Sequence, residues 1–144
     1  MKKFLFFSLI LLFMVKADAQ KCKAKDMPPA VMVAFNKAYP NTKKTYCGKD
    51  SNNYQVSFFN GKAPVSVTYD ATGKRMITEM QMAVEDLPQS VTEYVQKNYP
   101  GEIFQDVAQI TNAEGMVTYE VQVKEMDLIF DAKGNFLESM KCYD

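Results

Sequence analysis

The chain has 144 residues, of which 17 are Lys or Arg, 17 are Asp or Glu, three are Cys and none is His. This balanced charge gives no electrostatic basis for binding nucleic acid, which depends on clustered Lys and Arg. The absence of histidine excludes histidine-dependent hydrolase triads and removes the commonest protein ligand of transition metals.

Residues 1–19 have the order of an export signal. Lys2 and Lys3 precede an apolar run over residues 4–15, and Ala17-Asp18-Ala19 forms a small-residue cleavage motif. The apolar run is well short of the roughly twenty residues that a membrane-spanning helix needs. We therefore predict a signal peptide cleaved after Ala19, a periplasmic or secreted protein, and no membrane attachment after cleavage.

The region after the signal contains two similar halves. A common offset of 60 residues aligns the first segment of each half, and offsets of 65 and 61 align later segments. The aligned residues are Asp26-Met27-Pro28 with Asp86-Leu87-Pro88, Tyr39-Pro40 with Tyr99-Pro100, Tyr54-x-Val56 with Tyr119-x-Val121, and Asp70-Ala71-x-Gly73 with Asp131-Ala132-x-Gly134. The offset changes only between elements, where loops absorb insertions. We predict two tandem repeats, residues 20–82 and 83–144.

Each half is expected to open with one helix of about three turns. An aspartate can accept hydrogen bonds from the free amides at the helix start, and a proline two residues later fits the first turn. Apolar residues then recur at helical spacing until a Tyr-Pro pair disfavours further helix. The residues concerned are Asp26, Pro28 and Tyr39-Pro40 in one half, and Asp86, Pro88 and Tyr99-Pro100 in the other.

After each helix the apolar period changes to two, which is typical of antiparallel strands with one buried and one wet face. Turn residues at Asn60-Gly61, Asp70 to Gly73 and Asp131 to Gly134 separate the strands. The strands are predicted near residues 43–47, 54–58, 65–69 and 74–82, and near 103–110, 119–123, 126–130 and 135–143. The predicted class is α+β: two tandem repeats of one helix followed by a four-stranded antiparallel sheet, with sheets that can join into one.

These motifs together carry a resemblance to a known family. The Leu/Met-Pro opening, the Tyr-Pro helix end, the Tyr-x-Val strand and the Asp-x-x-Gly turn resemble the PepSY-like, β-lactamase-inhibitor-like family of envelope proteins in Bacteroidetes-type bacteria. The resemblance covers nearly all of the mature chain, twice. It implies the helix-plus-four-strand fold and a binding or inhibitory role, and it carries over no catalytic residues.

The three cysteines lie in a chain expected to be exported, where pairing is the ordinary fate. A first strand that runs back along the helix would return Cys47 towards Cys22, so we predict a Cys22–Cys47 disulfide with Cys142 left free or available to another chain. Cys22 also raises a lipoprotein as the alternative. Lys21, however, occupies the position where a lipidated cysteine needs a small residue.

No cofactor, metal site or catalytic residue is predicted, and the chain is expected not to be an enzyme. A catalytic thiol would still need a neighbouring base. The two Asp-x-x-Gly turns lack the alternating oxygen ligands of a calcium loop and are interpreted as plain turns. Met76, Met80 and Met82 could offer thioethers to Cu(I), but core packing explains them as well.

The predicted function is a secreted or periplasmic binding module with an unknown envelope protein as partner, and inhibition of an exported enzyme is one form of it. The alternative is a small-molecule or lipid carrier of the envelope. The predicted binding residues are Tyr46, Phe59 and Ile129, which would form aromatic or apolar points on a polar outward sheet face. Filling the contact between the two halves is the alternative role for Phe59 and Ile129.

Overall fold

The computed structural model describes residues 27–142. Its elements follow in chain order as α1 (Pro29–Ala38), β1 (Tyr46–Asp50), β2 (Asn53–Asn60), β3 (Ala63–Asp70), β4 (Arg75–Gln81), the 3-10 turn η2 (Val84–Asp86), α2 (Gln89–Asn98), β5 (Phe104–Asn112), β6 (Val117–Val123), β7 (Met126–Asp131) and β8 (Phe136–Lys141). No helix in this described part of the chain is long and apolar enough to span a membrane. The predicted signal peptide lies outside the described residues.

All eight strands form one antiparallel sheet in the order β1 to β8. The predicted class, an α+β protein of two helix-plus-four-strand repeats, is wrong: the fold is a single eight-stranded sheet with two short helices. The reason is the pairing of β4 with β5, from Ile77 opposite Asn112 to Gln81 opposite Ala108. Two separate sheets would leave the backbone groups of β4 and β5 unpaired at exposed edges, and their pairing satisfies both.

The helix starts differ from the expected caps. Pro88 is the N-cap of α2 and makes no side-chain cap, while its carbonyl accepts a hydrogen bond from the Val91 amide at 2.9 Å. Asp86, predicted to cap this helix, instead ends η2. The corresponding Asp26 lies outside the described residues. Proline suits the start of a helix because its fixed backbone angle is compatible with the first turn. The N–H group that proline lacks would have no hydrogen-bond partner within the helix there.

The two helices cover the same face of the sheet. Residues that pair across strands share a face, and the register leads from Val67 of β3 through Thr78 and Thr111 to Val117 of β6. The core under α1 contains Val31, Phe35, Val56, Phe58, Val65, Val67 and Tyr69. The core under α2 contains Val91, Val95, Val107, Val121, Val123, Leu128 and Phe130. The molecule therefore has two apolar cores on one side of one sheet.

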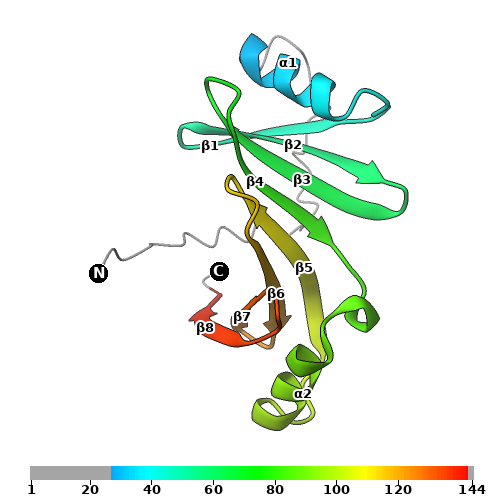
Figure 1. Ribbon diagram of the computed structural model, residues 1–144, viewed down its shortest axis with the longest axis vertical. Coiled ribbons are helices and arrows are strands. Elements are labelled where there is room, and N and C mark those ends of the chain that lie inside the picture. Colours follow the sequence, from blue (N-terminus) through cyan, green and yellow to red (C-terminus); the bar gives the residue numbers. More distant parts are fainter. Residues whose placement is uncertain (1–26, 143–144) are drawn as a thin grey trace.

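The opposite side, here called the helix-free face, has no helix among the described elements. Figure 1 shows α1 at the top against the first strands and α2 at the bottom against the last ones, with the second half of the sheet turned relative to the first. The sheet thus bends near β4 and β5, with both helices on the outer side of the bend. The helix-free face lines the inner side.

The two Asp-x-x-Gly turns bring the hairpins against the helix starts. Gly73 has φ of 84°, and a Cβ atom at this position would lie 2.5 Å from the carbonyl oxygen of Ala30 in α1. Asp70 holds the turn, because its Oδ1 accepts hydrogen bonds from the amides of Thr72 and Lys74 at 2.8 and 3.1 Å. The Asp70 carboxylate thus stabilises the turn itself.

Candidate functional site

The helix-free face is polar and yet largely buried. Its side chains alternate with those of the two cores, and seven of them expose less than a tenth of their surface: Ser57, Ser66, Ala108, Glu120, Gln122, Asp127 and Ile129. The sequence predicted this face to be wet because most of its residues are polar, and that prediction is wrong. The face lies on the inner side of the bend, and buried polar groups on it can pair with each other, as do the Ser57 and Ser66 hydroxyl oxygens, which lie 3.0 Å apart.

The charge on this face has one sign. Carboxylates from the successive strands β4 to β8 lie on it, including Glu79, Asp106, Glu120, Asp127 and Glu138, and no strand from β1 to β8 places a Lys or Arg there. Burial, and secondarily the charge of Asp106, raises the pKa of Glu79 to about 7. Burial also raises the pKa of Asp127 above its ordinary value. The face is thus acidic, and burial favours the protonated form of Glu79 and Asp127 on it.

Cys142 lies beside this acidic surface as a free thiol. Its Sγ donates a hydrogen bond to Asp127 Oδ1 at 3.0 Å and accepts one from Gln122 Nε2 at 3.1 Å. Burial raises the pKa of the thiol. Cys47 takes part in a disulfide bond. Because Cys22 lies outside the described residues, the Cys22–Cys47 pairing stays a prediction.

Two of the three predicted binding residues lie together. Tyr46 pairs with Ser57, and Phe59 follows Ser57 by two residues on the same strand, so both aromatic side chains lie on the helix-free face near the β1 edge. Tyr46 is 37% exposed and Phe59 is 58% exposed. Ile129 lies in β7, in the other half of the sheet, and is only 7% exposed. We call the exposed pair Tyr46 and Phe59 the aromatic corner.

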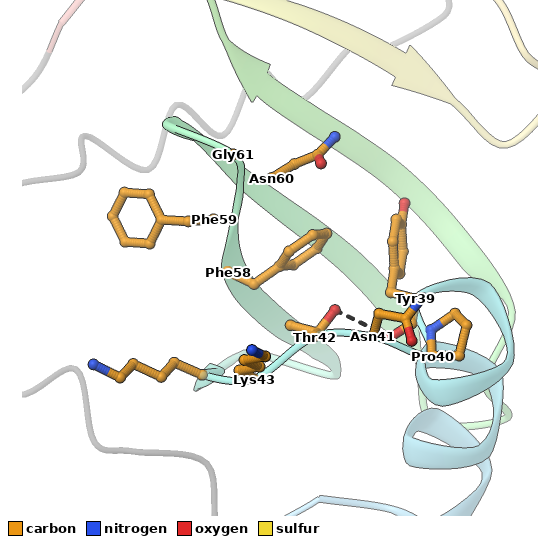
Figure 2. Close-up of a pocket in the computed structure, with 10 residues that line it drawn as sticks. Tyr39, Pro40, Asn41, Thr42, Lys43, Phe58, Phe59, Asn60 and Gly61 are labelled. Carbon is orange, nitrogen blue, oxygen red and sulfur yellow. Dashed lines mark hydrogen bonds between the residues drawn. The ribbon is translucent and has the colours of Figure 1, made fainter.

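A pocket of about 600 Å³ lies next to this corner, between the end of α1 and the end of β2. Residues 39–44 and 58–61 line it, and we call it the α1 pocket. Figure 2 shows the rings of Tyr39 and Phe58 facing each other, while Phe59 points to the other side of its strand. The sequence pattern interpreted Tyr39-Pro40 as the end of a helix and did not predict this pocket. The pair of lysines that follows Tyr39-Pro40 was the available signal.

In the described part of the chain, no three or more Cys, Asp and Glu side chains are grouped so that they could hold a metal ion. Two of the three methionines that suggested a Cu(I) site pack against different cores. Met80 packs against the core under α1, and Met82 against the core under α2. Core packing is therefore the role of these two side chains.

The fold defines a class of single-sheet proteins with two helices on one face, and the comparisons place the chain within it. The family model described as "Putative beta-lactamase-inhibitor-like, PepSY-like" matches residues 13–75 and 52–138. The chain belongs to this family, which confirms the resemblance inferred from its motifs. No curated protein has significant sequence similarity to it.

Solved structures of Bacteroides proteins share the fold. A "putative periplasmic" protein of Bacteroides eggerthii has 18% identity and a TM-score of 0.74, over 80% of this chain and 88% of that one. A DUF2874 family protein of Bacteroides ovatus has 16% identity and a TM-score of 0.74, over 80% and 87%. A BLIP-like protein of Bacteroides fragilis has 23% identity and a TM-score of 0.68, over 78% and 84%. The periplasmic description agrees with the location predicted from the export signal.

Proposed function

We propose that the protein is a non-catalytic binding protein of the periplasm, and that it holds an exported partner protein through the aromatic corner and the adjoining helix-free face. The observation that carries the proposal is the exposure of Tyr46 and Phe59 side by side on a polar surface. Protein interfaces are enriched in aromatic anchors surrounded by a polar rim. The likeness to a BLIP-like protein and the inhibitor-like family description favour an exported enzyme as the partner.

The surroundings of the corner support the same function. Phe59 pairs with Pro64 of β3, which adds apolar surface beside the exposed ring. The carboxylates of the helix-free face lie further along the sheet and offer charge complementarity to a basic partner surface, which increases association rate and selectivity. An aromatic anchor beside an acidic surface suits a partner that presents an apolar side chain flanked by Lys or Arg.

The test is capture of envelope proteins by tagged mature protein, residues 20–144, with wild type compared to two variants. Phe59→Ala removes an anchor from the corner, and Val33→Ala removes an apolar side chain of similar exposure, 68%, from α1 on the other side of the sheet. We expect one stoichiometric partner with wild type and Val33→Ala, and about tenfold weaker binding of that purified partner to Phe59→Ala. Equal affinity for both variants would remove the corner from the binding surface.

A further inference from the structure

We propose that the α1 pocket is a binding site for a small organic anion that carries a flat apolar group, such as an aromatic phosphate or carboxylate. This inference goes beyond the capture of a protein partner, because the pocket lies between α1 and β2 and its floor is formed by Tyr39 and Phe58, with Phe59 of the aromatic corner only at its border. Its volume of about 600 Å³ falls within the range of small-molecule sites, roughly 300–1,000 Å³.

The floor of the pocket is aromatic and held in place. The ring centroids of Tyr39 and Phe58 lie 4.7 Å apart, and Phe35 packs against both, at 5.3 and 5.5 Å. Phe35 and Phe58 are buried members of the core under α1, so the floor cannot shift without disturbing that core. A rigid aromatic floor favours a flat apolar ligand, because such rings stack or meet edge to face.

The rim of the pocket is basic. Lys43 and Lys44 line it, no Asp or Glu does, and neither lysine forms a salt bridge within residues 27–142. Two uncompensated cations beside an apolar floor favour a ligand with an anionic group at one end. The ligand would thus be amphipathic, with its charge towards the lysines and its ring towards Tyr39 and Phe58.

The loop that carries the lysines is already ordered. The Thr42 side chain and amide both donate hydrogen bonds to the carbonyl oxygen of Tyr39, at 3.0 and 3.3 Å, and Figure 2 shows the Thr42 side chain beside that bond. Pro40 restricts the backbone between them. A loop held in this way loses little conformational entropy when a ligand binds. The few contacts of a small ligand are therefore not offset by the cost of ordering the loop.

The corresponding segment after α2 shows that the fold itself does not require this composition. Tyr99-Pro100 repeats Tyr39-Pro40, yet the next residues are Gly101, Glu102 and Ile103 in place of Asn41, Thr42 and Lys43. Glu102 forms a salt bridge with Lys124 at 3.7 Å, so the cation there is compensated. The same local fold in the second half is thus neutral, and the basic rim is particular to the α1 pocket.

The test is titration of the ¹⁵N-labelled mature protein with phenyl phosphate, inorganic phosphate and benzylamine, followed by amide shifts. Phenyl phosphate should shift the amides of residues 41–44 and 58–61 and bind at least about tenfold more tightly than inorganic phosphate, because only it fills the aromatic floor. Benzylamine, with the ring but the opposite charge, should shift these amides little. Equal binding of phenyl phosphate and benzylamine, or of phenyl phosphate and inorganic phosphate, would overturn the proposal.

Matched charge variants test the rim. Lys43→Glu with Lys44→Glu should weaken phenyl phosphate by about tenfold or more, since two attractive contacts become repulsive. Lys97→Glu with Lys133→Glu changes the net charge equally at exposed sites in the second half and should have little effect. Equal loss in both variants would indicate general charge attraction and contradict a site. These exposed substitutions leave the core intact, and the aromatic corner is unchanged, so the outcome is independent of the protein-capture experiment.

Discussion

The Cys142 thiol and the Asp127 carboxylate form a hydrogen bond, with Sγ and Oδ1 3.0 Å apart. The negative charge of Asp127 opposes formation of the thiolate, and the hydrogen bond from Gln122 favours it, while burial raises the thiol pKa most. The thiolate is the form that reacts with alkylating agents. The reactivity of Cys142 therefore depends on two neighbours with opposite effects.

Changing either neighbour should shift the alkylation rate in a known direction. We expect Asp127→Asn to react severalfold faster than wild type with iodoacetamide at pH 8, and Gln122→Leu to react more slowly, because loss of the carboxylate favours the thiolate and loss of the amide donor disfavours it. Peptide-resolved mass spectrometry measures the rate at Cys142. The three proteins should react equally in 8 M urea, and a slower Asp127→Asn in the native state would contradict the assigned effect of the carboxylate.

Glu79 should make the folded protein less stable as the pH rises. Its folded-state pKa of about 7 lies above the ordinary value of 4.5, so the folded state holds the proton more tightly than the unfolded chain does. The contribution to the free energy of unfolding is present below about pH 4.5 and is lost as the pH rises through about 7. The full shift corresponds to about 3 kcal/mol, and partial exposure of Glu79 reduces the expected loss to about 1–2 kcal/mol.

Glu79→Gln should therefore be more stable than wild type at pH 8 and nearly equal to it at pH 5. Urea unfolding at the two pH values measures the difference. Glu114→Gln, at an exposed turn position, is the control and should follow wild type at both pH values. A wild-type protein that becomes steadily more stable from pH 5 to pH 8, with Glu79→Gln behaving identically, would contradict the prediction.

Alanine substitutions at two glycines with nearly equal backbone angles distinguish the stability cost of a positive φ from the cost of a steric contact. Gly73 has φ of 84° and Gly115 has φ of 83°, but only Gly73 faces a backbone oxygen, that of Ala30, at 2.5 Å from an added Cβ. Gly115→Ala should cost about 1 kcal/mol for the positive φ alone, and Gly73→Ala at least about 2 kcal/mol more because α1 must move. Equal losses in thermal unfolding would show that the hairpin does not press on α1.

Alanine substitutions at the three predicted binding residues should have different effects on the free energy of unfolding. Ile129→Ala should lower the free energy of unfolding by about 2–4 kcal/mol, since its side chain is buried. Phe59→Ala and Tyr46→Ala should each change it by less than about 1 kcal/mol, since both rings are substantially exposed. Losses of about 3 kcal/mol in both aromatic variants would place those rings in the core and exclude the aromatic corner as an anchor.

The local elements could be predicted because local spacing determines them. Alternation in Tyr54, Val56 and Phe58 indicates a strand with one apolar face, and all three lie in β2 as expected. The register of β4 against β5 could not be predicted, because Gln81 and Ala108 have no feature that specifies a neighbour. The division into two tandem repeats stays a prediction, since the single sheet runs through the boundary.

The helix-free face shows why the site was only partly predictable. Ser57 and Ser66 were expected to contact water because they are polar, but each satisfies the other across two strands, and residue type alone does not reveal such a partner. Phe59 stands out in the sequence as an apolar residue in a polar phase, and its side chain is 58% exposed. Ile129 had the same pattern and is buried, because burial on this face depends on the bend of the sheet.

The backbone pairing of β4 with β5 also determines what happens when the chain is cut between its two halves. It joins two apolar cores through backbone hydrogen bonds, so neither half can be removed without leaving a row of unpaired amides and carbonyls on the strand that remains. A fragment ending at residue 82 would present β4 as an open edge, the kind of surface that recruits foreign strands into aggregates. Proteolysis between the halves is therefore more damaging than the short, exposed linker at η2 suggests, because it converts a shared interior strand into a template for misassembly.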